Sequence, residues 1–203
     1  MRTVFSAALG FVLGGCASSG VHNPSGVPVT EMRPDERGFV AGTGVESTDI
    51  VTATDKMARE ILSIPEIANA QGKPYVITEP VVNNTRFPLN KEIFLTRIRQ
   101  QLNEKARGKM IFLARDRIAS LERERQLKQT GQVTASSDPN VQEFRGADYL
   151  LTGKLEGQST RTSQGISDYI LYTFQLISMR TSEIVYDGAY EIKKQGLEDA
   201  SYR

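Results

Sequence analysis

The chain contains few side chains that could carry out chemistry. Among its 203 residues there is one Cys (Cys16), one His (His22) and no Trp. A single Cys cannot form an internal disulfide or a Cys-rich zinc site, and a single His cannot supply paired imidazole ligands. Nucleophilic systems built on Ser-His-Asp or Cys-His lack a His and a thiol within the folded part. We therefore expect no metal site and no cofactor.

Paired carboxylates are the one catalytic arrangement that the composition leaves open. Two acidic side chains brought together in space could hydrolyse a glycosidic bond. The five acidic residues near strand edges or turns are the candidates: Glu79, Asp148, Glu156, Asp168 and Asp187. Acidic residues at such places are usually solvated, and no phosphate-binding or dinucleotide motif follows a strand. We expect no catalytic residue, and keep a hydrolase as the weaker alternative.

The residues before Cys16 have the pattern of a targeting segment. Arg2 is followed by ten uncharged residues, Val4 to Leu13, which are too few to span a membrane as a helix. The string Leu13-Gly14-Gly15-Cys16 then resembles the bacterial lipobox. We expect residues 1–15 to be a lipoprotein signal peptide and Cys16 to be the lipid attachment site. The alternative is an ordinary secretory signal with an incidental Cys.

The stretch after Cys16 predicts a flexible tether. Residues 17–47 hold three Pro, five Gly and four Ser, with Phe39 as the only aromatic residue, so they bury little apolar surface. We expect 16–47 to be the lipid anchor and tether. Ala17, rather than Asp, follows the Cys, which resembles outer-membrane lipoproteins that face the periplasm. Several acyl chains would hold the chain on that membrane stably.

From residue 48 onward the pattern predicts one folded domain, 48–203. Asn90 is a competent N-cap, and apolar residues then recur at helical spacing before Gly108. The remaining segments follow from periodicity and turn residues in the same way. The expected elements are helices at 49–63, 91–107 and 117–128, helical turns at 66–71 and 139–145, a strand at 75–82 that is interrupted at Glu79-Pro80, a turn at 83–86, strands at 110–114, 147–157, 168–179 and 183–193, and a polar loop at 158–167. This order predicts an α+β fold: a mixed sheet of four to five strands flanked by helices.

Charge is balanced overall but not locally. The formal net charge is +1, and export would keep the chain away from nucleic acid, so we expect no nucleic-acid partner. Residues 97–128, however, hold ten basic and four acidic side chains. These are either solvated helix faces or a docking patch for an acidic protein domain or an anionic cell-wall polymer.

Four stretches together resemble a known family, the LpoB-like outer-membrane lipoproteins that activate bifunctional penicillin-binding proteins. The resemblance covers residues 48–195, and each motif alone is weak. The stretches are Asp55-Lys56-Met57, Val81-Val82-Asn83-Asn84-Thr85, Gly146-Ala147-Asp148-Tyr149-Leu150-Leu151-Thr152-Gly153 and Thr181-Ser182-Glu183-Ile184-Val185-Tyr186.

The resemblance implies a fold similar to the N-terminal domain of the Tol-associated periplasmic protein, and a non-enzymatic role. Such a domain binds an accessory domain of a peptidoglycan synthase and stimulates its two activities. We expect a monomeric globular domain whose partner is a bifunctional penicillin-binding protein and whose lipid binds the membrane. The tether is shorter and less Pro-rich than in the best-known members. A lipoprotein of an outer-membrane secretion or surface-appendage assembly system is therefore the alternative.

Docking residues are expected on the strand 147–157. Thr152, Lys154 and Glu156 share one face by the two-residue period of a strand, opposite Leu151 and Leu155. The loop Asn84–Arg86 and the single residue Arg145 come next. The expected partner-binding residues are thus Thr152, Lys154, Glu156, Asn84, Arg86 and Arg145. We expect three tyrosines to be core residues instead: Tyr149, Tyr172 and Tyr190.

Overall fold

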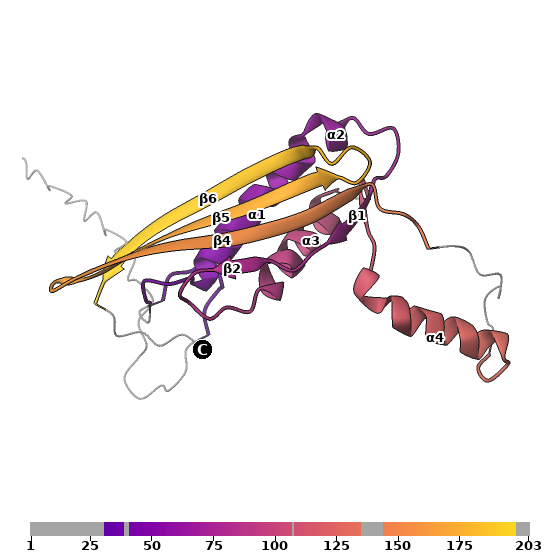
Figure 1. The fold of residues 1–203 in the computed structure, drawn as a ribbon, viewed down its shortest axis with the longest axis horizontal. Helices are drawn as coiled ribbons and strands as arrows, with labels where there is room; N and C mark the ends of the chain where they lie inside the picture. Colours follow the sequence, from indigo (N-terminus) through magenta and orange to yellow (C-terminus); the bar gives the residue numbers. More distant parts are fainter. Residues whose placement is uncertain (1–30, 39–40, 107, 135–143, 198–203) are drawn as a thin grey trace, which may run out of the picture.

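A computed structural model describes residues 31–38, 41–106, 108–134 and 144–197. Within these ranges the fold is α+β, as predicted, with one mixed sheet (Figure 1). The sheet has six strands rather than four or five, because the expected strand 75–82 is divided into two strands that pair separately with the same neighbour, and the short segment after Met110 also pairs. The strands are β1 (Tyr75–Thr78), β2 (Val82–Asn84), β3 (Ile111–Phe112), β4 (Tyr149–Thr162), β5 (Gly165–Ser178) and β6 (Ile184–Gly196).

The strand order is β3-β1-β4-β5-β6, with β2 also on β4. β1 and β2 pair with successive parts of β4, both in parallel, at Val76↔Tyr149 and Val82↔Lys154. The chain leaves the sheet between them at Pro80, which has no N–H to donate to a ladder. β4, β5 and β6 are antiparallel. This arrangement places the middle of β4 between β2 and β5.

Helices cover one face of the sheet. α1 (Ser47–Ser63) and α3 (Glu92–Ala106) lie side by side on it, and α2 (Pro65–Ala68) follows α1 (Figure 1). α1 begins two residues before the expected Asp49, because the Asp49 carboxylate accepts a hydrogen bond from the Glu46 backbone N–H at 2.8 Å and caps the helix there. The core between helices and sheet is apolar; its largest fully buried side chains include Tyr172, Phe94, Phe174, Met57, Ile61 and Ile98.

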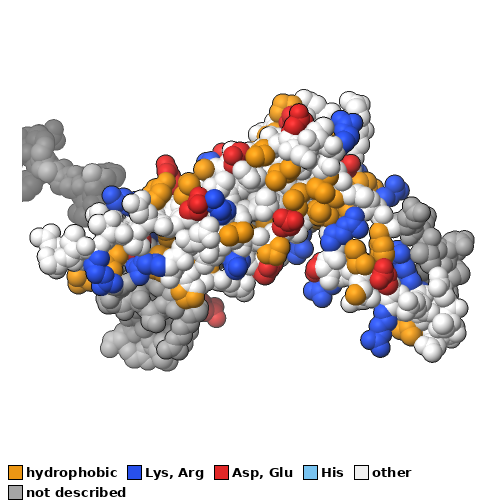
Figure 2. Space-filling model, viewed as in Figure 1, with side chains coloured by type: hydrophobic (Ala, Val, Ile, Leu, Met, Phe, Trp, Pro, Cys, Tyr) orange, Lys and Arg blue, Asp and Glu red, His pale blue; other side chains and the backbone are white. Residues whose placement is uncertain are grey.

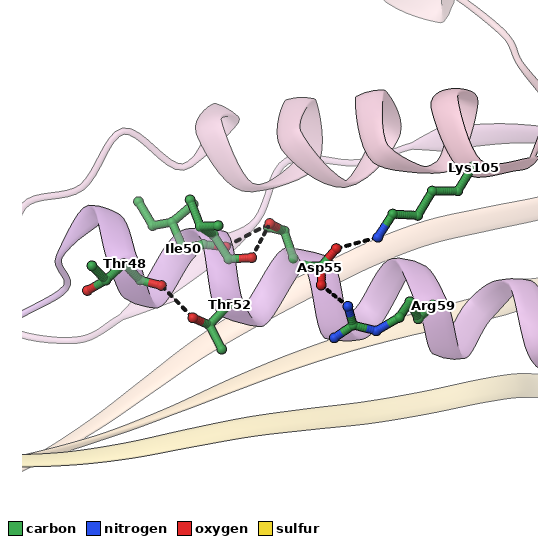
Figure 3. A network of polar contacts seen from close by, with 8 residues as sticks. Thr48, Ile50, Thr52, Asp55, Arg59 and Lys105 are labelled. Carbon is green, nitrogen blue, oxygen red and sulfur yellow. Dashed lines mark hydrogen bonds and ion pairs between the residues drawn. The ribbon is translucent and has the colours of Figure 1, made fainter. Parts of the chain in front are cut away.

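The two long helices are joined by a charged contact. Asp55 on α1 pairs with Lys105 on α3 and with Arg59 one turn further along α1 (Figure 3). These contacts lower the pKa of Asp55, with the hydrogen bond from Lys105 as the largest cause. Asp55 lies in the first stretch that carries the family resemblance. Its side chain connects α1 to α3 and is not free for a partner protein.

The polar stretch 158–167 is not the predicted loop. β4 continues to Thr162 and pairs with β5 from Gly165, so that only Ser163 and Gln164 form the turn. The sequence pattern misleads because the last residues of β4 are exposed and polar, so strand pairing rather than burial holds them; Ile166 of β5 is buried. Gly165 has φ 141°, and a Cβ there would lie 2.6 Å from the Gly196 carbonyl oxygen. Glycine is therefore required at the turn.

The other hairpin, β5–β6, forms as predicted. Its inner face contains a close contact between Gly188 and the Tyr186 ring: a Cβ at Gly188 would lie 1.8 Å from the Tyr186 hydroxyl oxygen. That hydroxyl donates a hydrogen bond to Glu60 of α1 at 2.7 Å. The small residue thus lets the tyrosine bend across the strand and reach the helix.

The end of the expected tether packs on the domain. Thr43 and Val45, assigned from the sequence to the tether, are buried. The Lys194 ammonium of β6 donates to the Gly44 carbonyl at 2.9 Å and pairs with Asp49 at 2.6 Å. The folded part of the described chain therefore includes residues before the expected start at 48.

The third expected helix stands apart from the sheet (Figure 1). It consists of a 3-10 turn, η1 (Arg115–Arg117), and α4 (Ile118–Gln129), none of whose residues is buried. No helix in the described ranges is both long and apolar enough to cross a bilayer. The lipid site Cys16 and most of the expected helical turn 139–145 lie outside the described residues.

Candidate docking surface

The sheet has one face covered by helices and one open face. Along β5 the inward side chains, such as Tyr172 and Phe174, are buried, and the alternate ones, such as Thr173 and Gln175, are half-buried. Because neighbouring strands keep the same alternation, the outward residues of β4, β5 and β6 form continuous rows across the open face. This face is the candidate docking surface.

Three expected docking residues lie on the open face together. Thr152, Lys154 and Glu156 alternate along β4 with Leu151 and Leu155, both of which are fully buried. The prediction that Thr152, Lys154 and Glu156 share one face of the strand is therefore confirmed. Lys154 and Glu156 form an ion pair at 2.8 Å and are each about half exposed.

Asn84 joins them from β2. Its register partner on β4 is Glu156, while Val82 lies beside Lys154. Val82 is 49% exposed, a large value for an aliphatic side chain in a strand. A groove of about 320 Å³ opens here, and its lining residues are Val82, Thr152, Gly153, Lys154, Glu156, Thr173 and Gln175. The groove offers hydroxyls, an amide and one charge of each sign.

Figure 2 shows Lys, Arg, Asp and Glu side chains interspersed with hydrophobic ones over this side of the molecule. The mixture has no single strong sign of charge. Such a surface suits a hydrogen-bonded contact with another protein, where opposite charges fix the register of the two partners.

Arg86 does not join the open face. Its guanidinium makes two hydrogen bonds to Asp168, at 2.9 and 2.7 Å, on the side of the sheet that the helices cover. Asp168 is 1% exposed and also accepts from the Ser159 hydroxyl. Burial raises the pKa of Asp168, but hydrogen bonds from Arg86, Ser159 and Thr43 outweigh burial and lower it to about 2.

Asn83 stabilises the turn that was predicted at 83–86, and through it the position of Arg86, which the sequence did not predict. Its side-chain amide donates to the Phe87 carbonyl at 2.8 Å, and its amide oxygen accepts from the Thr85 backbone N–H at 3.0 Å. Asn side chains commonly stabilise turns in this way. A Cβ at Gly157 would lie 3.1 Å from the Thr85 Cβ, so the loop also packs closely on β4. The Asn83-Asn84-Thr85 string is the part of the sequence that indicates this turn.

Arg145 lies at a different end of the domain. It precedes β4, and its guanidinium carbon lies 5.8 Å from the centre of the Tyr75 ring at the start of β1. Lys154 is in the middle of β4. The structure therefore does not bring Arg145 into the groove.

The basic stretch 97–128 is divided between α3 and the η1–α4 segment, and several of its charges have local partners. Lys105 pairs with Asp55, and Arg117 pairs with Asp116 at 3.1 Å. The Arg125 guanidinium lies 3.9 Å from the centre of the Phe144 ring. These contacts favour solvated and locally paired helix faces over one continuous docking patch.

Three of the five carboxylates considered for hydrolysis are already bound to other groups of the fold. Asp168 is bound to Arg86, Glu156 to Lys154, and Asp148 accepts from the Tyr75 backbone N–H at 2.7 Å. No cluster of three or more His, Cys, Asp or Glu side chains among the described residues could hold a metal ion.

Two of the three expected core tyrosines, Tyr149 and Tyr190, are only half-buried, whereas Tyr172 is fully buried.

Comparison with known proteins identifies the family. A family model described as "Peptidoglycan-synthase activator LpoB" matches residues 49–192. The solved LpoB C-terminal domain from Salmonella enterica is 16% identical, with a TM-score of 0.41, and the match covers 72% of this chain and 99% of that chain. Lipoprotein GNA1162 from Neisseria meningitidis is 15% identical, with a TM-score of 0.34 and coverage of 60% and 83%.

No curated protein sequence matches the chain. The family model nevertheless spans well over half of it and includes all four stretches noted in the sequence. The chain belongs to the LpoB family of peptidoglycan-synthase activators.

Proposed function

We propose that this chain is a lipid-anchored protein of the outer membrane that binds a bifunctional penicillin-binding protein from the periplasmic side and activates it. The observation that carries the proposal is the family match over residues 49–192. A purely binding role is supported by the candidate surface, whose groups donate and accept hydrogen bonds and lack a paired-carboxylate arrangement.

Activation requires that the docked domain favour one state of its partner. A ligand shifts a conformational equilibrium only if it binds one state more tightly than the other. We place the contact on the groove that crosses β2, β4 and β5, at Thr152, Lys154 and Glu156, and at Asn84, which lies beside Glu156. Arg86 positions the loop next to this groove through Asp168 and does not itself form the contact.

The groove assignment is tested by reversing charges. Lys154→Glu and Glu156→Lys each destroy the 2.8 Å ion pair and place two like charges two residues apart. We expect each to weaken binding to a purified bifunctional synthase about tenfold and to reduce its stimulated glycan polymerisation. The double variant restores an ion pair with the charges exchanged. If binding depends only on the presence of the pair, the double variant should bind as the unaltered chain does; if binding depends on which residue carries which charge, the double variant should stay weak.

The matched control is Lys91→Glu, since Lys91 is an exposed lysine just before α3, on the helix-covered side of the sheet rather than on the open face. It should bind as the unaltered chain does. Wild-type affinity in both charge-reversal variants would exclude the groove. The absence of any binding or rate change across the host's bifunctional synthases would refute the activator role itself.

The lipid anchor has a separate test. We expect mass spectrometry of the protein from outer membranes to show a mature chain that starts at Cys16 and carries acyl groups. Cys16→Ser should release it from the membrane. An unmodified thiol at Cys16 would refute the anchor without bearing on the docking groove.

A further inference from the structure

A second cleft lies at the opposite end of the domain from the β4–β5 turn. It has a volume of about 460 Å³, within the range of small-molecule sites. Three chain segments border it: the connection from α2 to β1, the start of β4, and the turn after β5. The side chains that matter here are Glu66, Lys73, Asp148, Tyr149, Met179 and Arg180.

Asp148 fixes the three segments together. Its carboxylate accepts from the Tyr75 N–H at 2.7 Å, and its own N–H donates to the Tyr75 carbonyl at 2.7 Å. Its carbonyl accepts from the Met179 N–H at 2.9 Å. Because backbone groups from β1 and from the β5–β6 turn are both bound to one residue, the walls are held in place before any ligand arrives.

Unpaired charges of both signs border this cleft. In the part of the chain that the structure describes, the side chains of Glu66 and Arg180 make no ion pair or hydrogen bond. The Lys73 ammonium lies instead beside Gly108, where an added Cβ would be 3.3 Å from it. Burial raises the pKa of Tyr149, Glu66 and Asp148 add to the increase, and Arg180 opposes it, which places these charges within reach of the hydroxyl.

The charges of the side chains around the cleft indicate which class of ligand it would bind. One unpaired cation, Arg180, and one unpaired carboxylate, Glu66, border the cleft, while the Asp148 carboxylate is already bound to the Tyr75 N–H. A simple anion would be attracted by Arg180 and repelled by Glu66, and a simple cation would meet the reverse. A molecule with a carboxylate and an ammonium group satisfies both.

We propose that this cleft binds a zwitterionic amino acid or short peptide, with its carboxylate toward Arg180 and its ammonium group toward Glu66. The Tyr149 hydroxyl is available to donate to the carboxylate. The site lies apart from the groove on β4 and does not depend on the proposed synthase contact. No bond is made or broken; the site is one of recognition.

The test uses three related probes on the isotope-labelled full chain in detergent, followed by backbone amide shifts in NMR. Alanylalanine carries both charges, N-acetyl-alanylalanine only the carboxylate, and alanylalanine amide only the ammonium group. We expect alanylalanine to shift the amides of Ala147, Tyr149 and Met179 in a saturable way at millimolar concentration. The two singly charged probes should bind about two- to fivefold more weakly, since each loses one partly exposed charge contact.

Two variants assign the ends of the ligand. Glu66→Gln should abolish the preference for a free amine while the preference for a free carboxylate remains, and Arg180→Gln should do the converse. Lys154→Gln, in the other groove, is the matched control and should change neither. Shifts that stay absent up to about 10 mM, equal binding of all three probes, or variants that leave both preferences intact would each overturn the proposal.

Discussion

The buried ion pair between Arg86 and Asp168 fixes the loop after β2 to the sheet, and its removal tests how much this contact stabilises the fold. Asp168 is 1% exposed, and the Arg86 side chain is 34% exposed. In Arg86→Gln the carboxylate would stay buried without its cation. Since the pKa of Asp168 falls from 3.8 to about 2 in the folded state, the ionised form is stabilised by about 2 kcal/mol relative to the unfolded chain. Removing one partner of a buried pair costs at least that much.

The sign of the pH dependence follows from the lowered pKa. The contribution of Asp168 to the free energy of unfolding is fully present above the unfolded pKa near 4. It is lost as the pH falls toward 2, and about half of it is gone at pH 3. In Arg86→Gln, burial is no longer opposed by the guanidinium, so the pKa of Asp168 rises. The variant should therefore lose less stability than the unaltered chain between pH 4 and pH 2.

Urea unfolding at a series of pH values measures both effects. We expect Arg86→Gln to lower the free energy of unfolding at pH 7 by about 2–3 kcal/mol and Asp168→Asn to lower it by a similar amount. The double variant should cost less than the sum, because each single change already breaks the pair. A loss below about 0.5 kcal/mol in Arg86→Gln, with an unaltered acid profile, would refute the reasoning.

Three further substitutions test contacts elsewhere in the fold. Gly188→Ala should destabilise by about 2–3 kcal/mol in urea unfolding, because the new Cβ would occupy the position of the Tyr186 hydroxyl; full stability would contradict the packing. Tyr172→Phe should leave stability unchanged or raise it by up to about 1 kcal/mol, since the buried Tyr172 hydroxyl has no partner in the described chain; a clear loss would reveal one. Lys105→Gln should cost no more than about 1 kcal/mol, because its pair with Asp55 is partly exposed, and a double-variant cycle measures the coupling.

Local patterns in the sequence predicted the elements whose own residues determine them. β1 matches its expected bounds because a short β-branched run lies between Pro74 and Pro80, neither of which can donate to a ladder. The β5–β6 hairpin and the outward row of Lys154 and Glu156 follow from strand alternation in the same way. The residues that determine these features are close to one another in the sequence, so the local pattern is enough to predict them.

Features that depend on distant residues were not predictable. Arg86 and Asp168 are 82 positions apart, and nothing in either local pattern distinguishes a buried pair from a solvated arginine and a solvated carboxylate. The polar stretch 158–167 looked like a loop, because pairing with β5 rather than burial makes it a strand. Tether residues Thr43 and Val45 gave no sign of packing, since their partners lie on other elements.

Several residues of the four stretches that resemble the family make structural contacts within the domain. Asp55 joins two helices, Asn83 shapes the turn before Arg86, and Asp148 ties three segments together. These side chains are already engaged within the fold, so they have little capacity left for a partner. The open-face residues Lys154 and Glu156 pair with each other and are about half exposed. Changes there should leave the scaffold intact, because exposed pairs contribute about 0–1 kcal/mol to stability. On the docking role that we propose for this face, the framework can stay constant while the face is adapted to a different partner.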